Sequence, residues 1–195
     1  DGSESGILLL KDINPSIGRS AYHLSAILKI GSKVFFNATS GPYGNGELWE
    51  SDGTESGTKL LKDINPGAAG ANIEYLAESN GKLLFNATDG VTGNELWTSD
   101  GTSAGTQLVV DLNPGAASSN ILDIKKFSNQ FLAVISNASG IELWISDRTA
   151  GGTQMIKDIN PGAGSSVDNF FGGIENLGYY YFVADDGTNG KELWR

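Results

Sequence analysis

The dipeptide Asn-Pro recurs along this sequence and ends each copy of a repeat. Residues whose types suit ligand binding lie a fixed number of positions after these Asn-Pro dipeptides. The side chain at each position varies among the copies, and together the positions mix polar, acidic and aromatic groups. Such a mixture around one opening is typical of a small pocket or a cation site. The candidate ligand-binding residues are Arg19, His23, Glu74, Tyr75, Asp123, Asn169 and Phe170.

The same sequence offers little for nucleophilic catalysis or for a histidine- or cysteine-bound metal. His23 is the only histidine, cysteine is absent and no Gly-x-Ser-x-Gly elbow occurs, so these chemistries lack their residues. Acidic pairs such as Asp185 and Asp186 could serve glycoside hydrolysis, which needs two suitably spaced carboxyl groups. We therefore predict a binding protein and not an enzyme, and rank a polysaccharide-acting hydrolase last.

The candidates are positioned by a sequence repeat. Successive Glu-Leu-Trp triplets are 48, 47 and 50 residues apart, and each opens a turn followed by an apolar run and Asn-Pro. The fourth copy is divided: KELWR stands at the C-terminal end and DGSESGILLLKDINP at the N-terminal end. The complete copies span Gly46–Pro66, Asn94–Pro114 and Ile141–Pro161.

The repeat spacing suits four short antiparallel strands, which is the size of a propeller blade. Runs such as VFF, LLF and YYYFVA do not alternate strictly with polar residues, as is typical of strands buried on both faces. We predict an all-β fold, a single four-bladed β-propeller of four-stranded antiparallel blades, with the ring closed by the N-terminal strand pairing with the last blade. The expected blades are residues 19–65, 70–113, 118–160 and 165–195, the last completed by residues 1–14.

The closed ring predicts a monomer of 20.5 kDa. Two arrangements stay open beside it. The four repeats could form half of an eight-bladed ring made by two chains, or part of a longer array.

Acidic and aromatic residues that recur in every copy are assigned to the fold. The tryptophans Trp49, Trp97, Trp144 and Trp194 are expected to pack between blades, although a sugar-stacking platform is the alternative. The aspartates Asp52, Asp100 and Asp147 are expected to hold the turns, since a calcium-loop spacing is absent. The sequon residues Asn37, Asn86 and Asn137 recur at one repeat position and are interpreted as strand-end hydrogen-bonding groups.

The charge and hydrophobicity of the sequence exclude two partner classes. The net charge is −10, with 13 basic against 23 acidic residues, whereas phosphate backbones require clustered cations. No run approaches the roughly 20 apolar residues of a membrane span. We expect neither nucleic-acid binding nor membrane insertion. The sequence begins at Asp1, which suggests a processed product and permits secretion.

The pattern ELW-x-S-D-G-T-x-x-G-T-x-L-x-K-D-I-N-P-G resembles the bacterial ELWxxDGT repeat family, and it covers nearly the whole sequence. The third copy departs from it with Arg148 in place of glycine, and the divided copy departs at Ser3 and Ser16. Members occur in tandem in large secreted or cell-surface proteins, so the resemblance implies a secreted or cell-surface location.

We predict an extracellular recognition or adhesion module that binds a glycan or a surface protein. Binding is expected through the variable-loop face, with calcium as a candidate cation in or near the central channel. This face is defined by the loops in which the copies differ, namely Ser40–Asn45, Asp89–Asn94, Ser139–Gly140 and Asp185–Gly190. The alternative is a purely structural spacer without a discrete pocket.

Overall fold

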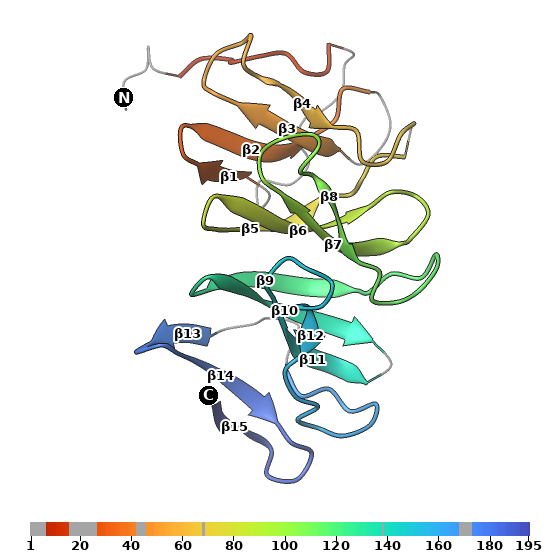
Figure 1. Cartoon of the computed structure of the whole chain (residues 1–195), viewed down its shortest axis with the longest axis vertical. Helices are drawn as coiled ribbons and strands as arrows, with labels where there is room; N and C mark the ends of the chain where they lie inside the picture. The colour runs from red at the N-terminus through yellow and green to blue at the C-terminus, as the bar shows by residue number, and fades with distance from the viewer. Residues whose placement is uncertain (1–6, 16–26, 42–45, 68, 138, 168–172) are drawn as a thin grey trace.

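The computed structural model contains only strands, turns and loops in the part of the chain that it describes, which confirms the all-β prediction. It describes residues 7–15, 27–41, 46–67, 69–137, 139–167 and 173–195. The strands form separate antiparallel meanders, stacked along the long axis of the molecule (Figure 1).

Each sheet contains strands in sequence order, as the repeat predicts. Sheet 1 consists of β1 (Ile27–Ile30), β2 (Lys33–Ala38), β3 (Glu47–Ser51) and β4 (Lys59–Lys62). Sheet 2 consists of β5 (Glu74–Ser79), β6 (Lys82–Thr88), β7 (Asn94–Ser99) and β8 (Gln107–Val110). Sheet 3 consists of β9 (Ile121–Phe127), β10 (Gln130–Asn137), β11 (Gly140–Ser146) and β12 (Gln154–Met155). Sheet 4 consists of β13 (Gly173–Asn176), β14 (Tyr179–Asp185) and β15 (Lys191–Trp194).

Apolar cores lie between successive sheets and hold the stack together. Sheets 1 and 2 share a core that contains Leu48 and Trp97, and sheets 2 and 3 share one that contains Leu96 and Trp144. The leucine of each Glu-Leu-Trp triplet therefore faces the following sheet, because neighbouring strand residues point to opposite faces. The tryptophan faces the preceding sheet. Packing of these tryptophans between blades is confirmed for Trp97 and Trp144.

The predicted closure of the ring is not seen in the described part of the chain. Residues 7–14 form no strand, sheet 4 has three strands, and no apolar core joins sheets 1 and 4. Residues 7–14 lie beside sheet 1, at the opposite end of the stack from β15 (Figure 1). Lys11 holds them there, because its Nζ donates to the Thr58 carbonyl at 2.7 Å and to the Glu55 carbonyl at 3.3 Å.

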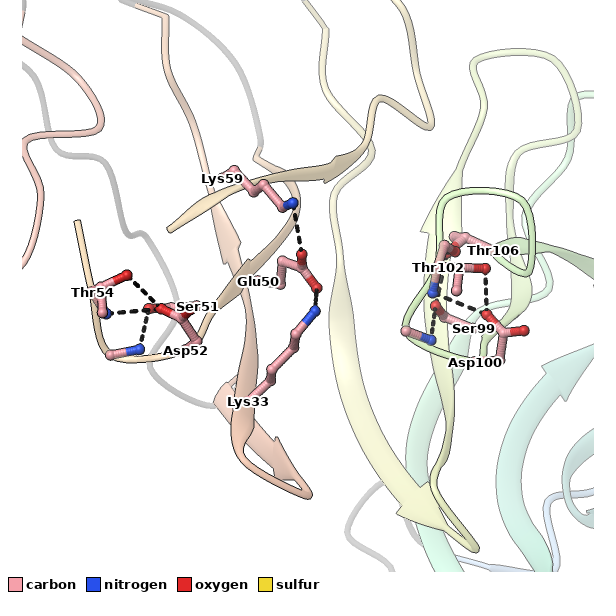
Figure 2. A network of polar contacts seen from close by, with 12 residues as sticks. Lys33, Glu50, Ser51, Asp52, Thr54, Lys59, Ser99, Asp100, Thr102 and Thr106 are labelled. Carbon is pink, nitrogen blue, oxygen red and sulfur yellow. Dashed lines mark hydrogen bonds and ion pairs between the residues drawn. The ribbon is translucent and has the colours of Figure 1, made fainter. Parts of the chain in front are cut away.

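The turn after each third strand is held by side-chain hydrogen bonds (Figure 2). Asp52 Oδ1 accepts from the Thr54 amide at 2.9 Å and from Thr54 Oγ1 at 2.7 Å. These bonds lower the pKa of Asp52, with the side-chain bond as the largest cause. Ser51 Oγ and Thr58 Oγ1 lie 2.7 Å apart and close the base of the turn. Asp100 and Asp147 make the same contacts, so the predicted turn role of these aspartates is confirmed.

The same turn requires a glycine that packs against the aspartate. A Cβ added to Gly152 would stand 2.1 Å from Asp147 Oδ1, whereas one added to the adjacent Gly151 meets nothing within 4 Å. We expect Gly152→Ala to displace the Asp147 carboxylate and to lower the free energy of unfolding by about 1–3 kcal/mol, the value of the bonds that it breaks. Urea unfolding followed by tryptophan fluorescence measures this change.

Gly151→Ala is the matched control and should change the free energy of unfolding by less than about 0.5 kcal/mol. Equal destabilisation by the two substitutions would contradict the assigned contact between Gly152 and Asp147.

Candidate functional site

A polar cavity of about 350 Å³ opens at the boundary of sheets 2 and 3. Carboxylate, amide and hydroxyl groups converge on it, and three aliphatic side chains complete its wall. Its polar lining consists of Glu74, Asn86, Asn94, Asn120 and Ser136, and its apolar lining of Ile121, Leu122 and Ile141.

Irregular backbone at the first strand of sheet 2 sets the direction of Glu74. The pairing of β5 with β6 shifts register between Glu74 and Ala77, and Tyr75 between them has a φ of +53°. Bulges of this kind re-aim side chains at sheet edges and near sites. Asn120, just before β9, has a φ of +42° and lines the facing side of the cavity.

Two amide oxygens of the cavity wall are buried without a hydrogen-bond partner among the described residues. These are Asn86 Oδ1 and Asn94 Oδ1, and Asn86 is almost fully buried. An unsatisfied buried acceptor costs about 1–3 kcal/mol. The equivalent oxygen in sheet 1, Asn37 Oδ1, is buried and unpartnered in the same way. The cavity wall itself combines a carboxylate with several amides, so it is suited to hydroxyl or ammonium groups, or to a cation.

The structure places three of the candidate residues close together. Glu74 lines the cavity, while Tyr75 and Asp123 lie beside it outside the lining. Burial raises the pKa of the Tyr75 hydroxyl, and the nearby charges of Glu74 and Asp123 raise it further. Asp123 also pairs with Lys125, whose Nζ lies 3.1 Å from its Oδ2. The other candidates, Arg19, His23, Asn169 and Phe170, lie outside the described residues.

Sequence reasoning missed the asparagines of the cavity as a group. The repeat pattern predicts a strand-end role for Asn86 and places Asn94 in a variable loop, and neither assignment indicates a binding site. One signal in the sequence does indicate this boundary. Glu74 and Leu122 occupy the same position after Asn-Pro in successive copies, and both line the cavity. Asn86 and Asn94 come from β6 and β7. The register of β5 with β6 places Asn86 opposite Glu74, and Asn94 pairs with Thr88 at the end of β6.

A second, apolar cavity of about 240 Å³ lies between sheets 3 and 4. Ile156, Tyr179 and Trp194 are among its lining residues. Two cations stack at its rim: Lys157 Nζ lies 5.3 Å from the Trp194 ring centroid, and the Arg195 guanidinium carbon lies 4.6 Å from that of Tyr179. At the boundary of sheets 1 and 2, by contrast, Leu108 of the fourth strand in sheet 2 packs into the shared core.

The glutamates of the Glu-Leu-Trp triplets have a structural role that the sequence did not reveal. Glu95 and Glu142 are fully buried, and Glu95 Oε2 accepts from the Leu112 amide at 3.0 Å. Each also accepts a hydrogen bond from the hydroxyl of a serine of the next repeat, Ser119 for Glu95 and Ser166 for Glu142. Burial is the largest cause that raises the pKa of both carboxyl groups. The glutamates thus fasten the end of each fourth strand to the third strand.

Neither a clustered metal site nor a spanning helix occurs within the described ranges. No three His, Asp or Glu side chains come together there as metal ligands. No helix there is long and apolar enough to cross a bilayer.

Comparison with known proteins supports the fold alone. No family model matches the chain, and no curated protein does. A structure from a study of two prolyl endopeptidases matches with a TM-score of 0.52 and 16% identity, over 84% of this chain and 24% of that one. This likeness supports a propeller-like all-β fold. The chain spans about a quarter of that protein's length.

Two more distant structures also match. A puromycin hydrolase matches with a TM-score of 0.44 and 14% identity, over 81% of this chain and 25% of that one. An engineered GH43 glycoside hydrolase matches with a TM-score of 0.36 and 11% identity, over 92% and 39%. Both are too distant to add to the argument.

Glu47 makes the fastening between strands sensitive to pH. Its Oε2 accepts from the Ile64 amide at 2.7 Å, and burial is the main cause that raises its pKa from 4.5 to about 7. A raised pKa means that the folded chain favours the protonated form. This contribution to stability is fully present below about pH 4.5 and is lost as the pH rises through about 7.

We therefore expect Glu47→Gln, which mimics the protonated group, to gain stability relative to the unmodified chain between pH 4.5 and pH 8. The expected gain is about 2 kcal/mol, allowing for partial solvent screening. Urea unfolding at a series of pH values measures it. Glu55→Gln, in an exposed turn, serves as the control. A difference between Glu47→Gln and the unmodified chain that does not vary with pH would contradict the assignment.

Proposed function

We propose that the chain is an extracellular recognition module that binds a glycan in the polar cavity between sheets 2 and 3. The observation that carries the proposal is the acceptor-rich wall of the cavity, which brings together the Glu74 carboxylate and the side-chain amides of Asn86 and Asn94. All three groups accept hydrogen bonds. A sugar presents several hydroxyl donors at short spacing, which is the complementary pattern.

The remaining properties of the cavity suit the same ligand class. Its volume of about 350 Å³ is at the lower end of the range for small-molecule sites, about 300–1,000 Å³. Ile121, Leu122 and Ile141 add an apolar wall, against which the C–H face of a pyranose can pack. The ligand of this proposal is therefore one or two sugar units of a larger glycan.

Calcium is proposed as an accessory ion and not as a requirement. Carboxylate and amide oxygens are the ligands that Ca²⁺ prefers, and Glu74, Asn86 and Asn94 supply such oxygens at one cavity. An ion held by these groups would still take several of its oxygen ligands from water or from sugar hydroxyls.

Binding without catalysis is favoured by the composition of the wall. Glu74 is the one carboxylate in the described lining, whereas glycoside hydrolysis uses two carboxyl groups about 5–9.5 Å apart. The secreted or cell-surface location of the module follows from its resemblance to the ELWxxDGT repeat family. The proposal does not depend on a closed ring, because the cavity lies inside the stack and not at its ends.

A glycan array with the purified chain, run in calcium and again with a chelator, tests the proposal. We expect binding to one class of glycan. Glu74→Gln should weaken it by at least about tenfold, the usual effect of removing one charged hydrogen-bonding group. Glu78→Gln is the matched control, because Glu78 lies on the same strand and caps the adjacent turn through the Gly81 amide at 2.8 Å.

Silence of the array in both conditions would overturn the glycan proposal and favour the structural spacer. If neither Glu74→Gln nor Glu78→Gln weakens binding, the glycan binds outside this cavity. Loss of binding in chelator would support the accessory calcium, whereas unchanged binding would remove calcium from the proposal.

A further inference from the structure

The outer edge of sheet 4 differs from the edges of the other sheets. In sheets 1 to 3 the third strand pairs on both sides, with the second strand and with a fourth. In sheet 4 the equivalent strand, β15, pairs with β14, and no described strand pairs with its other side. An open edge presents backbone N–H and C=O groups that can accept a further strand.

Residues 7–14 have the sequence of a fourth strand. Aligned on the Asn-Pro pairs, ILLLKDIN matches TKLLKDIN of sheet 1 and TQLVVDLN of sheet 2. This alignment places Leu9 at the position of Leu60, Leu108 and Met155, which lie opposite Trp49, Trp97 and Trp144 in their sheets. The repeated register therefore predicts that Leu9 pairs opposite Trp194.

The apolar cavity marks the place that such a strand would fill. Leu108 of the fourth strand in sheet 2 packs into the core shared with sheet 1. At the equivalent boundary between sheets 3 and 4, the space beside Trp194 is the cavity of about 240 Å³. Leu9 is 83% exposed. An exposed leucine and an apolar cavity at matching repeat positions are complementary.

Residues 7–14 contact sheet 1 in the same way as the fourth strand of sheet 1 contacts sheet 2. Lys62 Nζ of β4 donates to the Ser103 carbonyl in the turn of sheet 2 at 3.3 Å. Lys11, its equivalent, donates to the carbonyl of Glu55, the equivalent of Ser103, also at 3.3 Å. The segment thus occupies the fourth-strand position relative to sheet 1, while no other strand of such a blade lies beside it in the described structure.

We propose that the open edge of sheet 4 accepts residues 7–13 of a second copy of this chain, so that copies associate head to tail. The donated strand would complete sheet 4 and bring the second copy's sheet 1 onto its outer face. That face carries Leu193, which is 72% exposed, although its equivalents Leu48 and Leu96 are fully buried by their neighbouring sheets. Ile174 and Val183 are exposed on the same sheet.

The donor is a second copy and not the same chain, because sheets 1 and 4 lie at opposite ends of the stack (Figure 1). The exposed apolar side chains of sheet 1 include Ile27 and Leu60, and they would meet the exposed face of the neighbour's sheet 4. Such a head-to-tail interface generates a ring if the rotation closes and an open assembly if it does not. This inference is independent of the polar cavity, which lies elsewhere.

Engineered cysteines test the donated strand, because the natural sequence contains none. The register pairs Glu50 with Lys59, Thr98 with Gln107 and Ile145 with Gln154, so Arg195 should lie opposite Leu8. A Leu8→Cys variant and an Arg195→Cys variant are mixed and oxidised. We expect a mixed disulfide dimer well above the two same-variant dimers.

The control replaces Arg195→Cys by Leu177→Cys, in the exposed β13–β14 turn of the same sheet, and should give no excess of mixed dimer. A chain carrying both Leu8→Cys and Arg195→Cys that oxidises only to a cross-linked monomer would overturn the proposal in favour of the closed ring. Absence of any cross-link between positions 8 and 195 would also overturn it.

Light scattering over a concentration series tests the association without cysteines. We expect a mass that rises above 20.5 kDa with concentration, and a constant 20.5 kDa would overturn the proposal.

Leu9→Asp places a charge in the apolar cavity and should weaken association by at least about tenfold. Val91→Asp, at an exposed site in the loop between β6 and β7, should leave association unchanged. Circular dichroism shows whether each variant is folded.

Discussion

Burial of both faces of every sheet against its neighbours is the constraint on which this structure depends. A four-stranded sheet of this size exposes two apolar faces, and neither can be covered from within the same repeat. The Glu-Leu-Trp triplet meets the constraint with two neighbouring residues, because leucine faces the following sheet and tryptophan the preceding one. Where a neighbour is present, as for Leu48 and Leu96, the side chain is fully buried; where none is present, as for Leu193, it is exposed.

The fold was largely predictable because the same turn residues and apolar runs recur in each copy of the repeat. The Ser-Asp-Gly-Thr turns formed as expected, since an aspartate followed by glycine and threonine satisfies the turn amides locally. The role of Glu95 was not predictable, because its partners, the Leu112 amide and Ser119, come from the fourth strand and the next repeat. Closure of the ring is not seen among the described residues. Residues 7–14 have the sequence of a fourth strand but lie beside sheet 1 (Figure 1), and the repeat pattern alone does not specify which sheet such a segment meets.

Part of the candidate site was not predictable from the sequence, because residues that align in the repeats pair differently in the sheets. The sequons align Asn137 with Asn37 and Asn86, but the sheet places Val134 opposite Leu143 where Asn37 and Asn86 lie opposite Leu48 and Leu96. The shorter loop in the third copy shifts the strand, so identical letters occupy different positions. The polar cavity arises beside this shift, together with the irregular start of β5. Departures from the repeat therefore open a cavity at the boundary of sheets 2 and 3.

The interface between sheets recurs along the chain, whereas the polar cavity occurs once among the described sheets. Head-to-tail association would reuse the interface that already joins sheets within the chain, so each added copy extends the stack by the same contacts. The combination of Glu74, Asn86 and Asn94 with the irregular β5 occurs once among the described sheets, so each copy would add one polar cavity at a fixed spacing. Sites fixed at regular spacing on a rigid array bind a polymer with an effective concentration that a single weak site lacks. Each cavity would then need only a modest affinity for one or two sugar units, because binding of a repetitive surface would gain strength from the number of cavities engaged at once.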